Sequence, residues 1–245
     1  MALTVSIHNK INILKKWTVF LMFFNFGISQ WAAFDIQQEA YSSVDLRTFI
    51  ESTTFGLSAN TAHMLSSEKR VNVGMGFSRN ILLRSNRYQN QFSGRFPNFS
   101  VDVFITNNLY LIGRLSQFYS NEDIIQFHNY GFALTSGEDD SYPWQSSVVF
   151  CNLAGPRDFA LRSVSLKMIT RIQMIGHQVQ MGIGKEMYST TFYINDVNFP
   201  SKMKGEINYL LLGMQFERNL FRIMPQIRLH PRLIGTSVRM TWGIG

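Results

Sequence analysis

The stretch Gly235-Thr-Ser-Val-Arg-Met-Thr-Trp-Gly-Ile-Gly245 ends the chain with a strict alternation of apolar and polar side chains. Its apolar positions are Val238, Met240, Trp242 and Ile244, and its polar or small positions are Ser237, Arg239, Thr241 and Gly243. Successive side chains of a β-strand point to opposite faces. This period of two therefore predicts a strand with one face toward an apolar phase.

The same alternation recurs over most of the chain. Residues 70–78, 178–184 and 221–230 each repeat it, with turn signals between the periodic segments. Such a pattern predicts antiparallel strands joined by short connections. The ten predicted strands are 70–79, 98–106, 109–118, 124–135, 146–154, 158–172, 178–194, 205–217, 220–230 and 235–245. Because a pattern defines strand boundaries only loosely, roughly eight to twelve strands are compatible with it.

The composition favours a membrane barrel over an average soluble domain. Of the 245 residues, 45% are hydrophobic and 16% are charged, whereas about 25% of an average soluble domain is charged. Beyond the N-terminus there is no apolar run of the ~20 residues that a membrane helix needs. We therefore predict an all-β fold, an antiparallel transmembrane β-barrel of about ten strands, because only every second residue of each strand must then face lipid.

One tight turn predicts how two late strands pair. A two-residue loop at Arg218-Asn219 pairs Phe216 with Phe221, as two-residue hairpin loops do. The apolar positions of both strands then share one face, and Glu217 joins Arg222 on the other.

A second tight turn, at Asn107-Asn108, does the same for two earlier strands. It aligns Val101 with Tyr110 on the apolar face. In this register Arg114 falls on the apolar face, which only a bulge or a position near the lipid headgroups would explain.

The connections predict an orientation. If the C-terminus lies in the periplasm, both tight turns are periplasmic, and the long connections 80–97 and 195–204 face outward, the usual asymmetry of such barrels. Residues 136–144 fit this scheme poorly, because they would form a long periplasmic turn. The pair 158–172 and 178–194 exceeds the ~9–11 residues that cross a bilayer, so we expect it to project beyond the membrane.

The N-terminal part of the chain differs from the rest. Residues 1–29 combine the basic pair Lys15-Lys16, a short apolar stretch and small residues before Gln30, as a secretory signal peptide does; an N-terminal membrane anchor is the alternative. Residues 30–69 form an N-terminal segment that is partly helical, since Ser43–Glu51 has apolar residues at helical spacing. This helix would pack at the periplasmic mouth or inside the barrel, unless the segment is a disordered leader. Residues 70–245 form the barrel.

Charge and special residues exclude several functions. The formal charge of +7 includes Lys10, Lys15 and Lys16 of the signal, which leaves 20 basic against 16 acidic residues, a net +4. No basic run or nucleic-acid motif accompanies it, so we expect no nucleic-acid partner. Cys151 is the single cysteine, and no histidines have metal-ligand spacing. We expect no cofactor and no metal, and no catalytic constellation can be assigned, so the chain is not predicted to be an enzyme.

The polar face of the last strands supplies the candidate site, the predicted lumenal residues. These are Arg222, Arg228, Arg239, Glu217, Gln215 and Gln226. One hypothesis is a cationic constriction that favours anions. The other is a filled interior in which the arginines pair with carboxylates such as Glu217 and Asp102, since a barrel of about eight to ten strands has little free lumen.

Aromatic residues near predicted strand ends fit the interfacial girdles of a membrane barrel. They are Tyr110, Phe118, Trp144, Tyr188, Phe192, Tyr193 and Trp242.

The last strand resembles the C-terminal assembly signal of Gram-negative outer-membrane β-barrels, which ends on alternating apolar residues. Gly245 stands where that signal usually has an aromatic residue. The resemblance implies outer-membrane lipid and the barrel-assembly machinery as partners. The segment Leu46–Phe77 also resembles uncharacterised outer-membrane proteins of the Bacteroidetes type.

The sequence thus predicts an outer-membrane β-barrel with a structural, adhesive or narrow small-solute transport role, and it identifies no solute. The alternative is a secreted or periplasmic soluble β-sandwich or lipocalin-like protein that binds a ligand. Both have the same alternation, because turning a barrel inside out leaves the period unchanged. Low charge density and glycines on the polar face favour the membrane barrel.

Overall fold

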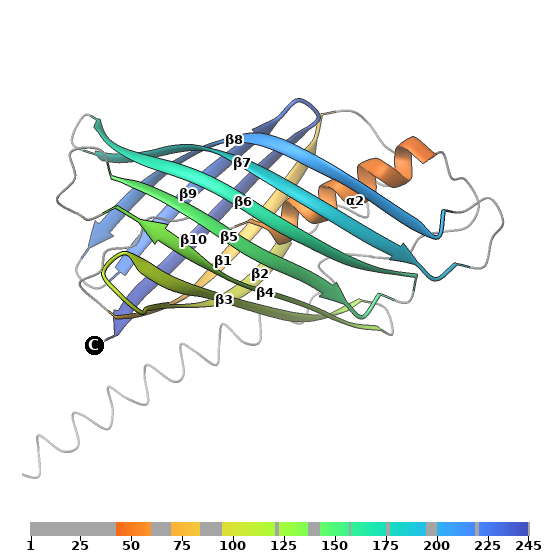
Figure 1. Ribbon diagram of the computed structural model, residues 1–245, viewed down its shortest axis with the longest axis horizontal. Helices are drawn as coiled ribbons and strands as arrows, with labels where there is room; N and C mark the ends of the chain where they lie inside the picture. Colours follow the sequence, from red (N-terminus) through yellow and green to blue (C-terminus); the bar gives the residue numbers. More distant parts are fainter. Residues whose placement is uncertain are drawn as a thin grey trace, which may run out of the picture.

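Ten antiparallel strands form a closed barrel around one helix in the computed structural model (Figure 1). The structure describes residues 43–59, 70–83, 95–120, 123–136, 143–156, 158–174, 177–194, 200–218 and 221–244. The predicted signal peptide, residues 1–29, lies outside these ranges. The elements are α2 (Ser43–Leu57), β1 (Val71–Leu82), β2 (Arg95–Phe104), β3 (Leu109–Ser120), β4 (Asp123–Thr135), β5 (Trp144–Ala154), β6 (Phe159–Met174), β7 (His177–Phe192), β8 (Lys202–Arg218), β9 (Phe221–His230) and β10 (Leu233–Ile244).

The barrel is closed by its first and last strands. Each strand pairs with its sequence neighbour, and β1 pairs with β10 from Val71 opposite Ile244 to Leu82 opposite Leu233. Closure leaves no strand edge with free backbone groups, which is the condition for spanning a hydrocarbon core. The prediction of an antiparallel ten-stranded barrel with a short N-terminal helix is confirmed.

The alternation places apolar side chains outside and polar ones inside. On β1, Phe77 and Ile81 are exposed on the outer wall, whereas Asn72, Ser78 and Asn80 are buried in the lumen. A soluble barrel would have the opposite arrangement, because water would surround its outer face. The soluble ligand-binding alternative is therefore contradicted, and the fold has the architecture of an outer-membrane β-barrel.

The register between β2 and β3 corrects one prediction. Phe104 pairs with Tyr110, and Asp102 pairs with Ile112. The backbone N–H of Ile105 donates to the carbonyl of Leu109 at 2.9 Å, so the loop holds three residues rather than two. This shift by one residue moves Tyr110, Ile112 and Arg114 to the lumen. The unexplained apolar position of Arg114 thus came from the predicted register.

The hairpin of β8 and β9 also has a different register from the predicted one. Phe216 pairs with Ile223 rather than Phe221, and Glu217 pairs with Arg222. The partner moves by two residues, an even number, so every side chain keeps its predicted face.

The two ends of the barrel differ. The C-terminus lies at one end, and α2 lies inside the opposite end (Figure 1). Strands β1 and β7 end, and β2 and β8 begin, at the α2 end, which we call the outward end; β4 ends and β5 begins at the C-terminal end. Most residues of the predicted long connections 80–97 and 195–204 lie outside the described ranges. Short periplasmic turns and longer outward loops are usual for these barrels.

Three predicted girdle residues lie in the lumen. Tyr110, Tyr188 and Phe192 are buried there, whereas Trp144 and Tyr193 are exposed on the outer wall. Aromatic residues occur at strand ends either on the outer wall, at the membrane interface, or in the lumen, where they pack against other side chains. Only the strand register shows which of the two faces a given residue occupies.

No described helix is long and apolar enough to cross a membrane.

Candidate functional site: the filled lumen

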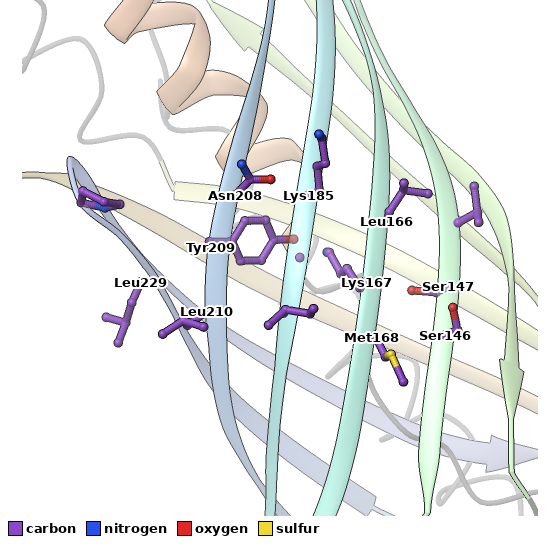
Figure 2. Close-up of a pocket in the computed structure, with 14 residues that line it drawn as sticks. Ser146, Ser147, Leu166, Lys167, Met168, Lys185, Asn208, Tyr209, Leu210 and Leu229 are labelled. Atoms are coloured by element: carbon purple, nitrogen blue, oxygen red, sulfur yellow. The ribbon is translucent and has the colours of Figure 1, made fainter.

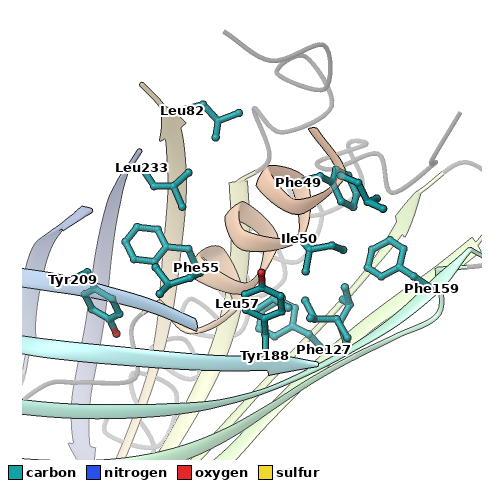
Figure 3. Close-up of a cluster of buried hydrophobic side chains, with 14 of the residues drawn as sticks. Phe49, Ile50, Phe55, Leu57, Leu82, Phe127, Phe159, Tyr188, Tyr209 and Leu233 are labelled. Atoms are coloured by element: carbon teal, nitrogen blue, oxygen red, sulfur yellow. The ribbon is translucent and has the colours of Figure 1, made fainter. Parts of the chain in front are cut away.

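Helix α2 fills the outward half of the lumen; we call residues 43–59 the plug. Its apolar side chains Leu46, Phe49, Ile50, Phe55 and Leu57 are at most 2% exposed. Figure 3 shows aromatic and aliphatic side chains of the barrel wall gathered around the helix. Burying each large apolar side chain contributes about 1.5–3 kcal/mol, so packing rather than helix propensity holds the plug in place.

Aromatic contacts orient the plug against two parts of the wall. Phe49 packs edge-on against Phe159, with ring centroids 5.6 Å apart. Phe55 packs edge-on against Tyr209 at 5.1 Å. The Arg228 guanidinium lies over the Phe55 ring, 4.1 Å from its centroid. Edge-on pairs and a cation over a ring both add to the energy of burial alone.

Two threonines in the hydroxyl-rich turn of the plug bond back to their own helix. Thr53 donates to the carbonyl of Phe49 at 3.0 Å, and Thr54 donates to that of Ile50 at 2.8 Å. Hydroxyls buried without a partner would destabilise the fold, so this back-bonding lets the two threonines lie buried in the lumen. The pattern Leu46, Phe49, Ile50 predicted the start of the helix, but Thr53 and Thr54 hid its extension to Leu57.

Side chains of the wall bind the C-terminal end of the plug. Lys167 donates from Nζ to the carbonyl of Ser58 at 2.6 Å, and Asn129 donates from Nδ2 to that of Leu57 at 2.8 Å. Ser78 donates to the carbonyl of Gly56 at 3.3 Å. The last carbonyls of a helix lack partners within it and carry partial negative charge. The wall therefore supplies donors, one of them cationic, where the helix needs them.

A second polar group binds the plug near its middle and outward side. Asn80 donates from Nδ2 to the carbonyl of Ser52 at 2.6 Å. The buried Glu51 carboxylate pairs with Arg232 at 2.8 Å and with Arg47 at 3.1 Å. The helix therefore runs from the outward end toward the middle of the barrel.

Below the plug lies a buried carboxylate, Glu186 of β7. Its Oε1 accepts from the Tyr209 hydroxyl at 2.7 Å and from Ser165 at 2.9 Å. Lys167 Nζ lies 4.0 Å from the same oxygen. Arg228 donates from Nη1 to the hydroxyl of Ser58 at 3.1 Å. A buried charge needs such partners, because desolvation costs several kcal/mol per ion.

A second buried carboxylate, Asp102 of β2, holds two arginines. Arg239 Nη2 pairs with its Oδ2 and donates to the Ser100 hydroxyl at 3.1 Å. Arg114 Nη2 lies 3.7 Å from its Oδ1. Both guanidiniums and the carboxylate are almost fully buried. Together with Lys167, Arg228 and Glu186, they place charges in the described lumen that contact one another or hydrogen-bond, rather than a ring of arginines without partners.

The six predicted lumenal residues do not form one cluster. Arg228, Arg239, Gln226 and Gln215 are buried in the lumen. Gln215 accepts from Gln180 at 3.0 Å and donates to Glu217 at 2.7 Å. Arg222 pairs with Glu217 at 2.6 Å, but the Glu217 side chain is 46% exposed, at the C-terminal end of the barrel.

The three arginines also lie at different depths. Arg239 pairs with Met224 of β9, two residues from Arg222, whereas Arg228 lies four residues farther along that strand. The lumenal positions of Arg114, Lys167, Glu186 and Tyr209 were not predicted from the sequence. Lys167 and Glu186 stand on the small or polar face of their strands, and that position is a signal that could have found them. Arg114 and Tyr209 have apolar neighbours on their lumenal faces, so no local pattern identifies them.

Among the described residues, no group of three histidine, cysteine, aspartate or glutamate side chains is placed to hold a metal ion.

Comparison with known proteins gives structural neighbours only. No protein-family model matches the chain, and no curated protein matches it. The attachment invasion locus protein Ail of Yersinia pestis is similar at 12% identity and a TM-score of 0.27, over 73% of this chain and 98% of that one. Ail in complex with the heparin analogue sucrose octasulfate is similar at 13% identity and a TM-score of 0.25, over the same shares.

Proposed function

We propose that this chain is a closed, non-conducting outer-membrane barrel that displays an extended sheet outside the cell, in a structural or adhesive role. The observation that carries the proposal is the plug, whose five apolar side chains are at most 2% exposed inside the barrel. A lumen filled in this way leaves the outward surface as the part available for interaction.

The lengths of three strands support the proposal that the sheet extends beyond the membrane. Strands β6, β7 and β8 have 16, 16 and 17 residues, whereas about 9–11 residues cross a bilayer. The excess lies at the outward end, because Lys202, Lys204 and Arg162 mark a polar outer wall there. Strand β7 ends and β8 begins at the same end.

A narrow transport role requires the plug to move. The ion pairs of Asp102 and Glu186 occupy the lumen below it, and arginines paired with carboxylates do not select anions as an open ring would. We therefore expect the folded wild-type protein to give no steady channels in a planar lipid bilayer. Steady open channels from protein that shows a heat-dependent gel shift would contradict the closed barrel.

Display is tested by labelling single cysteines in intact Gram-negative cells. Cys151 is buried and is replaced by serine to give a clean background. In that background Ser189→Cys lies on the projecting outer wall, and Met181→Cys lies on the apolar wall as its matched control. We expect a membrane-impermeant maleimide to label position 189 and not 181. Labelling of neither in cells, with both reactive after solubilisation, would contradict outward display.

Assembly is also a proposal. Strand β10 pairs along its whole length with β1 and completes the closure, so we propose that it engages the barrel-assembly machinery. We propose no catalytic role. The Bacteroidetes-type origin implied by the resemblance of Leu46–Phe77 stays a prediction.

A further inference from the structure

The plug has a fixed direction in the barrel, and its contacts along β6 define that direction. Phe49 packs against Phe159 at the outward start of this strand. The carbonyl of Ser58 accepts from Lys167 of the same strand, which lies about 26 Å farther toward the C-terminal end at about 3.3 Å per residue. The later residues of the plug therefore lie deeper in the lumen than the earlier ones.

Strand β1 gives the same direction independently. Asn80 donates to the carbonyl of Ser52, and Ser78, the next lumenal residue toward the C-terminal end, donates to the carbonyl of Gly56. Strand β1 runs outward along the chain, whereas β6 runs inward. Because two strands of opposite direction agree, the amino-terminal end of the helix faces the outward mouth.

The first turns of the plug reach this mouth. The Arg47 side chain is 54% exposed. Glu51 pairs with Arg232 in the turn between β9 and β10, and the Arg232 side chain is 48% exposed. A helix rises about 1.5 Å per residue, so Ser43 lies about 9 Å farther along the helix axis than Phe49. The chain therefore points out of the barrel where the plug begins.

The wall of the lumen stabilises this direction and no other. Two buried cations, Lys167 and Arg228, contact Ser58 at the carboxyl end of the plug. That end of a helix carries partial negative charge, and the amino end carries partial positive charge. A reversed plug would place its positive end against both cations and would leave its last carbonyls without these donors.

The chain crosses the barrel between Ser43 and Val71. Ala59 is buried inside the closed wall, and Val71 lies beside Ile244 at the C-terminal end. The amino-terminal side of this crossing is outward, and its carboxyl side continues into β1.

We propose that the barrel exports its own amino-terminal segment, so that the chain preceding Ser43 is exposed on the cell surface. The closed wall and the plug leave this segment no route back to the periplasm. It crosses as an extended chain before β1 and β10 complete the closure. The inference rests on the proposed outward display, and it adds a second exposed part to the sheet.

The test places an epitope, followed by the site of a specific protease, directly before Ser43 in the full chain. The protease is added to intact Gram-negative cells. We expect the epitope to be released into the medium, while the barrel keeps its heat-dependent gel shift. The matched control carries the same insert between β4 and β5, at the C-terminal end, and should be cleaved only after the outer membrane is permeabilised.

A pair of cysteines on the plug shows whether the plug stays in place during export. In the Cys151→Ser background, Arg47→Cys lies at the mouth, and Thr53→Cys lies in the packed part of the helix, where Thr53 is buried. We expect a membrane-impermeant maleimide to label position 47 and not position 53. Labelling of both would mean that the plug leaves the lumen, and would overturn the inference.

The label at position 189 of the projecting sheet separates this inference from the display on which it rests. Cells in which position 189 is labelled but the epitope stays uncleaved would overturn the export of the amino-terminal segment alone. Cells in which position 189 is unlabelled and the insert between β4 and β5 is cleaved would overturn the outward display as well.

Discussion

At the scale of single residues, Gly184 lets Tyr209 reach its carboxylate partner. The Tyr209 ring extends from β8 toward the neighbouring strand (Figure 2). It lies where a Cβ at position 184 would stand, so an aromatic side chain covers a glycine of that strand. We expect Gly184→Val to displace the ring from Glu186 and to lower the free energy of unfolding by about 1–3 kcal/mol. Urea titration in detergent micelles, read by the gel shift, measures this. Gly113→Ala, where a Cβ finds ordinary space, should change it by less than about 0.5 kcal/mol.

The buried ion group around Asp102 gives a second prediction for single residues. Asp102→Asn leaves Arg114 and Arg239 buried beside a neutral amide. Removing one partner of a buried pair costs about 3–5 kcal/mol of unfolding free energy. The control Glu206→Gln breaks the exposed pair with Lys185 and should cost less than about 1 kcal/mol. Equal losses from the two variants in the same urea titration would mean that the lumen around Asp102 is wet.

At the scale of elements, the plug predicts how the lumen can be opened. Phe49→Asp places a carboxylate against Phe159 in the apolar packing of α2, where burying a charge without a partner is costly. We expect the plug to leave its position and steady channels to appear in planar bilayers. Phe49→Leu keeps an apolar side chain there and should stay closed. If folded Phe49→Asp conducts no current, the ion pairs below the plug block the lumen by themselves.

The faces of single strands could be predicted from the sequence, whereas the pairing between strands could not always be. Alternation alone defined the two faces of β1, β7 and β10, because a period of two depends on no partner strand. The pairing of β2 with β3 needed the length of one loop, and a single residue reversed the face of Arg114. The contact between Lys167 and the carbonyl of Ser58 joins residues 109 positions apart, which no local pattern contains.

At the scale of the whole molecule, the membrane orientation makes the outer wall sensitive to charge according to depth. Leu212 lies on the exposed apolar wall between Phe216 and Leu210 of β8. Arginine on the lipid face costs about 2–4 kcal/mol near the bilayer midplane and about 0–1 kcal/mol near the interface. We therefore expect Leu212→Arg to reduce the free energy of folding into lipid vesicles by the larger amount. Thr191→Arg, on the outer wall at the outward end, should cost the smaller amount.

The measurement is urea-dependent folding into vesicles, followed by the difference in gel migration before and after boiling, since a closed wall resists the detergent. A soluble barrel would tolerate both arginines equally, because water would solvate either position. Equal, small effects at positions 191 and 212 would therefore mean that the apolar wall does not face lipid. A large loss at position 212 alone would locate the hydrocarbon core of the membrane at the level of Leu212 and place Thr191 outside it.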